Sequence, residues 1–175
     1  LLSLSLVILI LALGSLTAGA DSSNTWIVHP TDTRANFTKI QDAVNNATDG
    51  DYIEVWNSTY TENIYVNKSL TIYSRDGKDV TIVQANNSND HVFNVTVDWV
   101  NISGFTVKNA SEFGTVAGIN LDGVEHCTIS DNNVTNNDIG IALIYSSGNT
   151  IRNNLAGLNI ICGIYLESSN DNILT

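Results

Sequence analysis

Basic residues, cysteines and methionines are scarce in this chain of 175 residues. Seven lysines and arginines stand against 18 aspartates and glutamates, which leaves a net charge of −11. A surface of that charge repels nucleic acid and anionic lipid, and it repels acidic polysaccharides unless cations intervene. Two cysteines cannot build a disulfide framework. The lack of methionine removes one class of copper ligand.

Long apolar runs are missing except at the N-terminus. Residues 1–20 hold an uncharged apolar stretch followed by small residues that fit a cleavage site before Asp21. The stretch is shorter than the ~18 residues typical of a spanning helix. We therefore expect residues 1–20 to be a secretory signal peptide that is clipped at its N-terminus, with a membrane anchor as the alternative. The mature part would then contain no membrane span and would be extracellular, on the cell surface or periplasmic.

Repetition is what the chain has in abundance. Three similar segments begin with Gly118, Gly140 and Gly163. Ile129, Ile151 and Ile173 fall 22 residues apart. A unit of that size cannot bury its own apolar face, so neighbouring units must stack. Because short alternating stretches between Asn, Ser, Asp and Gly turns predict strands, we expect an all-β, parallel β-helix with coils of about 22 residues.

Residues at equal phase in such coils should form ladders. The expected interior ladders are Ile129, Ile151 and Ile173; Ile119, Ile141 and Ile164; and Leu121, Leu143 and Leu166. Asn132 and Asn154 should stack at a corner through their side-chain amides. Earlier strands are expected where Ile53 and Val55, or Val80 and Ile82, alternate with polar residues.

The segment before the coils has a different period. The apolar residues with spacings of three and four are Phe37, Ile40, Val44 and Ala47. They predict a short helix over residues 37–47, with Asn36 as N-cap, that covers the open end of the core. We expect a cap over residues 21–50 and repeats over 51–175. The repeats end in mid-unit, which favours a fragment truncated at its C-terminus.

Asparagine is unusually frequent, with 24 copies. Nine lie in N-x-S/T sequons, about twice the chance number: Asn36, Asn46, Asn57, Asn67, Asn86, Asn94, Asn101, Asn109 and Asn133. This excess favours a glycosylated, exported protein. The alternative is that polar turns supply Asn, Ser and Thr together.

Two further expectations follow from the 22-residue period. Cys127 and Cys162 are 35 residues apart, about one and a half coils, so they should lie too far from each other for a disulfide. Ile102 and Ile129 are separated by 27 residues, five more than one period. The extra residues fall in 109–117, which should protrude as a loop and could mark a binding face.

Residues 37–77 resemble the N-terminal cap and first coils of right-handed parallel β-helix proteins. The shared elements are a helix at Ile40 to Val44, a Gly50-Asp51 turn, a corner at Tyr60 to Ile64 and a strand at Lys68 to Ile72. The chain is similar to the pectin-lyase-like superfamily, and within it to NosD-type periplasmic and surface β-helix proteins. The resemblance implies a right-handed β-helix over about residues 26–175. It leaves the function open.

The polysaccharide-active members of that superfamily carry catalytic motifs that this chain lacks. The motifs absent here are Asn-Thr-Asp, Asp-Asp, Gly-His-Gly and Arg-Ile-Lys. The coils offer Lys108 and Arg152 as bases, but neither has an acidic cluster beside it for calcium. No cofactor is therefore expected, although calcium remains possible.

One coil holds the densest polar group. The candidate catalytic residues are Asp122, Glu125, His126 and Asp131. A carboxylate and a histidine in one coil could do acid–base chemistry, but a solvated corner explains them equally. For copper, which the NosD resemblance implies, His29, His91 and His126 are scattered.

The sequence thus favours a secreted or surface protein with a structural or recognition role and carbohydrate as partner. Tyr145 and Tyr165 on a polar, Asn-rich face could contact sugar rings. One alternative is a lyase or glycoside hydrolase whose catalytic residues lie in missing C-terminal coils. Another is a NosD-like accessory factor for copper-enzyme maturation.

Overall fold

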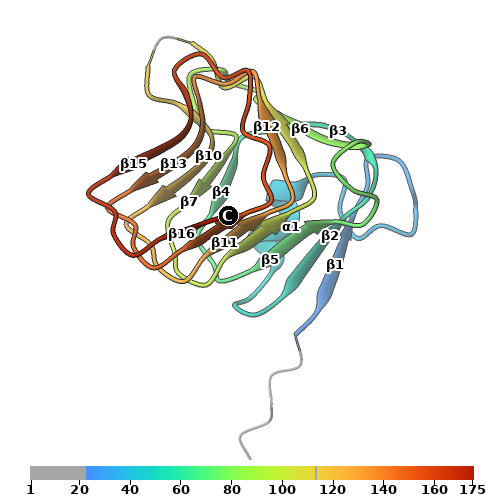
Figure 1. Cartoon of the computed structure of the whole chain (residues 1–175). Coiled ribbons are helices and arrows are strands. Elements are labelled where there is room, and N and C mark those ends of the chain that lie inside the picture. The colour runs from blue at the N-terminus through green and yellow to red at the C-terminus, as the bar shows by residue number, and fades with distance from the viewer. Residues whose placement is uncertain (1–22, 113) are drawn as a thin grey trace, which may run out of the picture.

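The structure is a computed structural model that describes residues 23–112 and 114–175, so the expected signal peptide lies outside the described residues. The chain winds into a right-handed parallel β-helix of about six turns (Figure 1). The repeat predicted the parallel β-helix, and the family resemblance implied its hand. Each turn contributes one strand to each of up to three sheets. All strand pairs are parallel, which follows from stacking one turn on the next.

The three sheets are named A, B and C. Sheet A contains, in spatial order, β1 (Thr25–Val28), β2 (Tyr52–Val55), β5 (Thr71–Ser74), β8 (Asn101–Ser103), β11 (Thr128–Ser130), β14 (Thr150–Arg152) and β16 (Ile173–Leu174). Sheet B contains β3 (Ser58–Thr61), β6 (Thr81–Gln84), β9 (Thr106–Lys108) and β12 (Asn133–Thr135). Sheet C contains β4 (Ile64–Val66), β7 (Phe93–Val95), β10 (Ala117–Asp122), β13 (Ile139–Ile144) and β15 (Cys162–Glu167).

The interior ladders follow the predicted phase with one exception. Ile119, Ile141 and Ile164 stack in register, as do Leu121, Leu143 and Leu166, and Ile129 pairs with Ile151. The prediction for Ile173 is wrong, because Leu174 pairs with Ile151 while Ile173 pairs with Thr150 and is exposed. The last turn contains an extra residue after Asn159, since Ile139 pairs with Cys162 rather than with residue 161. That residue shifts every later position by one.

The prediction for Val80 and Ile82 is also wrong. Thr81 and Val83 fill the core in β6, whereas Val80 is exposed and Ile82 half-buried. Thr81 can be buried because its hydroxyl oxygen accepts a hydrogen bond from Ser74 Oγ at 2.7 Å. Alternation alone does not say which of two adjacent residues faces inward when the strand follows a loop.

Asparagines stack between turns as predicted. Asn132 donates to Asn154 Oδ1 from its backbone nitrogen at 3.0 Å and from Nδ2 at 3.1 Å. The same contact recurs at other corners, where Asn137 lies over Asn159 and Asn149 over Asn172. The side chains of Asn132, Asn137 and Asn149 are fully buried. These amides satisfy backbone groups where the chain turns between sheets and makes no ladder hydrogen bonds.

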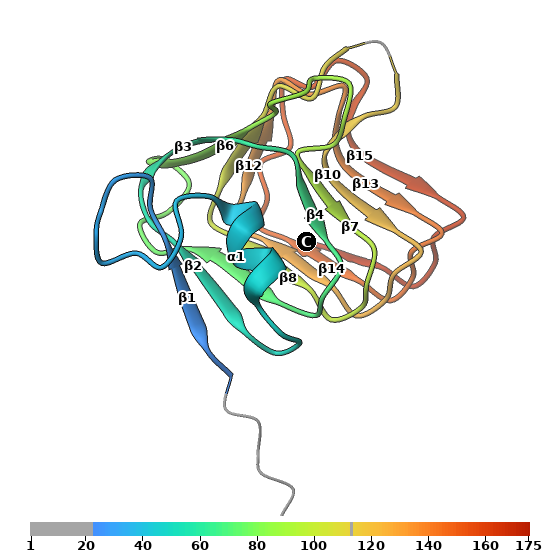
Figure 2. The ribbon, with the colours of Figure 1, turned by 180° about the vertical axis from the view of Figure 1, so that it is seen from behind.

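The cap helix α1 (Ile40–Asn46) lies over the end of the coil, and Ile40, Ala43 and Val44 are buried (Figure 2). It begins at Ile40 rather than residue 37, because Phe37 forms a bridge with Val28. Asn36 is not the N-cap. Its Oδ1 accepts from Ile27 N instead, and the carboxylate of Glu62, from a neighbouring turn, accepts from the first two helix amides at 3.0 Å each.

The predicted insertion protrudes. Eight residues, 109–116, connect β9 to β10, whereas three residues connect β12 to β13 (Figure 1). A second long loop, residues 85–92 between β6 and β7, was not predicted. Glu112 joins the two loops, because its Oε2 accepts from Ser88 Oγ at 2.8 Å and Asn89 Nδ2 at 3.0 Å. The loops therefore stand side by side above sheet C.

Candidate functional site

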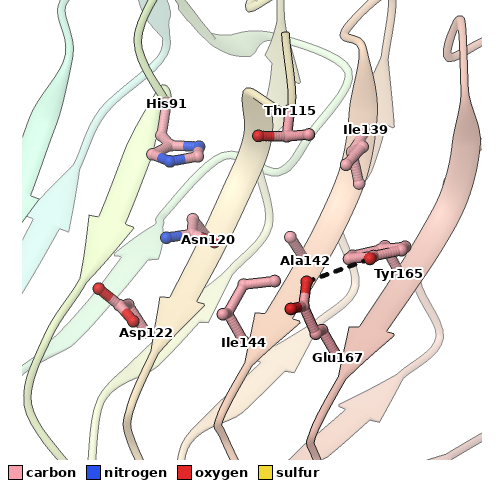
Figure 3. Close-up of a pocket in the computed structure, with 9 residues that line it drawn as sticks. All are labelled: His91, Thr115, Asn120, Asp122, Ile139, Ala142, Ile144, Tyr165 and Glu167. Atoms are coloured by element: carbon pink, nitrogen blue, oxygen red, sulfur yellow. Dashed lines mark hydrogen bonds between the residues drawn. The ribbon is translucent and has the colours of Figure 1, made fainter.

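A pocket of about 250 Å³ opens on the outer face of sheet C, below the two loops (Figure 3). Its polar lining residues are His91, Thr115, Asn120, Asp122, Tyr165 and Glu167. Its apolar lining residues are Ile139, Ala142 and Ile144, which belong to a small cluster separate from the main core. His91 and Thr115 end the two loops, and the other seven residues lie on β10, β13 and β15.

Strand register explains the hollow. Asn120, Ala142 and Tyr165 form one row across three adjacent strands, and the short Ala142 leaves a gap between its two larger neighbours. The next row holds Asp122, Ile144 and Glu167. Since adjacent strands lie ~4.8 Å apart, the two acidic residues start from backbone positions about 10 Å apart on opposite sides of Ile144.

Internal hydrogen bonds hold the polar groups. Tyr165 donates from its hydroxyl to Glu167 Oε2 at 3.1 Å, and this bond raises the pKa of Tyr165. Asn120 is only 6% exposed and donates from Nδ2 to Asn94 Oδ1 at 3.1 Å. His91 Nδ1 accepts from Ala117 N at 2.9 Å. In neutral His91 the proton therefore sits on Nε2, which leaves that nitrogen as a donor.

His91 should make the stability of the protein depend on pH. Burial lowers the pKa of His91, although Asp90 and Asp122 oppose the shift. The unfolded chain binds this proton more readily, so stability is complete above about pH 6.5 and falls as the pH drops below it. We expect His91→Gln to flatten the fall in unfolding free energy between pH 7.5 and 5.5, measured by urea denaturation. His126→Gln, at an exposed histidine, is the control and should keep the parent slope. Equal slopes in the parent and His91→Gln would contradict this role.

The four candidate catalytic residues are not gathered in one place. Asp122 lines the pocket. Glu125 and His126 lie in the turn after β10, where His126 stacks on Trp99 with ring centroids 4.2 Å apart and lies 3.8 Å from the Glu125 carboxylate. Asp131 follows β11, adopts a positive φ of 60° and lies 3.6 Å from Arg152. Of these residues, Asp122 alone faces the pocket.

Among the pocket residues that sequence reasoning missed are Glu167 and His91. Glu167 occupies the same position in its coil as Asp122 does two coils earlier, so an alignment of the repeats would have shown it. His91 lies in the unpredicted loop, so no periodic signal marks it. Tyr165 was predicted to face a ligand and lines the pocket, whereas Tyr145 lies at a corner with a φ of 49° and does not.

In the part of the chain that the structure describes, the candidate copper ligands do not come together. Within residues 23–112 and 114–175, no three His, Cys, Asp or Glu side chains come together to hold a metal ion. His29 Nδ1 is engaged by Asp32 N at 2.9 Å, and burial raises the pKa of Cys127 to about 11. Cys127 and Cys162 are both free, and Cys162 packs on the apolar cluster beneath the pocket.

The sequon asparagines differ from the ladder asparagines in burial. None of the nine is buried in the described structure, and six are exposed: Asn36, Asn46, Asn57, Asn67, Asn86 and Asn109. Asn94, Asn101 and Asn133 are half-buried. The buried ladder asparagines Asn132, Asn137 and Asn149 are outside sequons, as is the buried Asn120 of the pocket. Glycosylation of the nine stays a prediction, and the exposure of six of them permits it.

Comparison with known proteins adds a family and a relative. The family model described as periplasmic copper-binding protein (NosD) matches residues 40–175. A cell surface glycoprotein of Methanothermus fervidus is 33% identical over 135 residues, which cover 76% of this chain and 20% of that protein. The chain thus spans about a fifth of the length of this relative.

Two solved structures share the fold. An alginate lyase from Paenibacillus sp. str. FPU-7 has a TM-score of 0.63 at 20% identity, covering 87% of this chain and 58% of its own. A pectin methylesterase in complex with hexasaccharide VII has a TM-score of 0.60 at 11% identity, and the match covers 74% of this chain and 49% of the esterase. At these identities the likeness concerns the fold. Among the described residues, no helix has the length and apolar character needed to cross a membrane.

Proposed function

Because this chain belongs to the NosD family, we propose that it is a surface β-helix protein that binds carbohydrate in the pocket on sheet C. The carrying observation is the pocket itself, where an aromatic ring stands beside hydrogen-bonding groups over an apolar floor. Sugars present both hydroxyl groups and apolar ring faces, so this combination suits them. The strands hold the groups rigidly, which lowers the cost of ordering them on binding.

The location is supported by three independent features. The relative in Methanothermus fervidus is named a cell surface glycoprotein, and the family description is periplasmic. Six of the nine sequon asparagines are exposed, as glycosylation of an exported protein requires. Residues 1–20 have the composition of a secretory signal. We therefore propose that the coils act outside the cytoplasm.

A second candidate function is glycoside hydrolysis, and one observation favours it. Asp122 and Glu167 both line the pocket, and inverting glycosidases need two carboxyl groups that flank the bound sugar. A general acid in such enzymes requires a raised pKa, which burial in an apolar site supplies. Both carboxylates are exposed here. Binding without turnover is therefore the better supported of the two.

A matched pair of tyrosines tests the proposal. We expect Tyr165→Ala to weaken binding of the best ligand from a panel of soluble oligosaccharides by about tenfold or more, the loss of one ring contact. Tyr145→Ala removes an exposed tyrosine outside the pocket and should leave affinity unchanged. Isothermal titration calorimetry with and without calcium gives the affinities. The opposite order of effects would contradict the proposal. Depolymerisation that Asp122→Ala abolishes would establish the enzymatic alternative.

A further inference from the structure

The polar groups of the pocket are mostly hydrogen-bond acceptors. Asn120 uses one N–H of its side-chain amide on Asn94, which leaves its carbonyl oxygen and its second N–H. Glu167 and Asp122 present carboxylates, and Tyr165 spends its proton on Glu167. The remaining donors are His91 Nε2, the Thr115 hydroxyl and one N–H of Asn120. A ligand that satisfies this pocket must therefore bring more donors than acceptors.

The charge of the pocket points the same way. Two carboxylates line it, and no lysine or arginine is among its described lining residues. Burial lowers the pKa of His91, which favours the neutral ring, and its Nδ1 is already engaged by Ala117 N. The chain as a whole carries a net charge of −11, so the rest of the protein does not offset the negative charge of the pocket. A uronic acid would place a carboxylate against two others and against an acceptor oxygen, which costs free energy with no compensating hydrogen bond.

We infer that the pocket selects amino sugars, whose ammonium group supplies three donors and a positive charge, and that it rejects uronic acids. This inference rests on the proposed function, because it names the sugar class for the same site. The geometry suits it, since Asp122 and Glu167 lie on either side of Ile144 and Ala142, where a sugar ring would rest (Figure 3). An ammonium group between or beside these carboxylates gains charge-assisted hydrogen bonds.

Three oligosaccharides of equal length separate charge from shape. Oligomers of glucosamine and of N-acetylglucosamine share a backbone and differ in the ammonium group, and oligogalacturonate carries the opposite charge. By titration calorimetry at low salt, we expect the glucosamine oligomer to bind at least tenfold more tightly than its acetylated counterpart. Oligogalacturonate should show no binding. The preference should shrink at high salt, because ions screen an exposed charge pair.

Matched substitutions show whether the pocket causes the preference. Asp122→Asn and Glu167→Gln should each reduce the preference for glucosamine over N-acetylglucosamine at least threefold. Glu125→Gln removes the same charge from an exposed residue outside the pocket and should leave the preference unchanged. If all three variants change it equally, attraction is to the whole acidic surface and the inference is wrong.

The outcomes also separate this inference from the proposed function. Binding of N-acetylglucosamine oligomers, lost in Tyr165→Ala but without preference for the amino form, would overturn the amino-sugar inference and keep the carbohydrate site. Tight binding of oligogalacturonate that is lost in Tyr165→Ala would also overturn the amino-sugar inference and keep the carbohydrate site. No binding of any oligosaccharide would overturn both.

Discussion

A methyl group at Gly140 is expected to destabilise the β-helix by about 3 kcal/mol or more, as overpacking against backbone does. A Cβ built there would collide with the carbonyl oxygen of Gly163, lie 2.7 Å from Asn159 Nδ2 and 3.3 Å from Ala156 Cβ. The carbonyl oxygen belongs to the backbone of the next turn, so it cannot move without shifting β15. Gly140→Ala, measured by urea denaturation at neutral pH, gives the loss directly.

Gly157→Ala is the matched control for this result. No heavy atom lies within 4 Å of a Cβ built at Gly157, and its φ is not in the left-handed region. We expect the unfolding free energy of that variant to stay within about 0.5 kcal/mol of the parent. If Gly140→Ala proved as stable as Gly157→Ala, close packing between the turns at Gly140 in β13 would be excluded.

The glycine that opens each repeat illustrates what a sequence can and cannot say about a coil. Its recurrence at Gly118, Gly140 and Gly163 marked the period and predicted the parallel β-helix. The reason for glycine lies in contacts between turns, because a Cβ at Gly118 would come within 2.6 Å of Val134 and 2.7 Å of Asn137. Val134 and Asn137 are not one full period away from Gly118 in the sequence, so the period could not predict these contacts.

Errors in the predicted fold arise where the turns change length. The ladder through Ile129 and Ile151 was correct while turns kept 22 residues, and it failed at Ile173 after one extra residue near Asn159. Thr81 replaced Val80 in the core after a loop of unpredictable length. A single residue reverses the inward and outward faces of a strand, so local alternation cannot correct for it.

The candidate site was partly within reach of the sequence. Asp122 and the insertion at 109–117 were predicted to lie near a ligand, and Asp122 and Thr115 do line the same pocket. The pocket also needs Ala142, whose importance is its small size beside Tyr165. A small residue on an outward face carries no chemical signal, and only the register of three strands shows the gap it leaves.

The second large loss of stability is expected when a buried asparagine of a ladder is replaced by a carboxylate. Asn137 is fully buried, accepts from Ala110 N at 3.0 Å and donates from Nδ2 to the carbonyl oxygens of Val107 and Thr135. Asn137→Asp removes these donated bonds and the bond from Nδ2 to Asn159 Oδ1 at 3.3 Å, and it turns a negative charge toward these acceptor oxygens. We expect a loss of about 3 to 5 kcal/mol in unfolding free energy at pH 7, typical of an uncompensated buried charge.

The pH dependence of that loss distinguishes buried charge from simple misfolding. The introduced carboxyl group should have a raised pKa in the folded state, since only its protonated form can donate to the carbonyl oxygens. The loss relative to the parent should therefore be largest at neutral pH and shrink as the pH falls toward about 3.9, the pKa in the unfolded chain. The control is Asn136→Asp, which adds the same charge at the neighbouring exposed residue. Asn136 already adopts a φ of 55°, which Asp tolerates. This substitution should cost little at either pH. Urea denaturation of both variants at pH 7 and pH 4.5 gives the comparison, and an equal loss in the two variants would show that the ladder amide does not stabilise the corner.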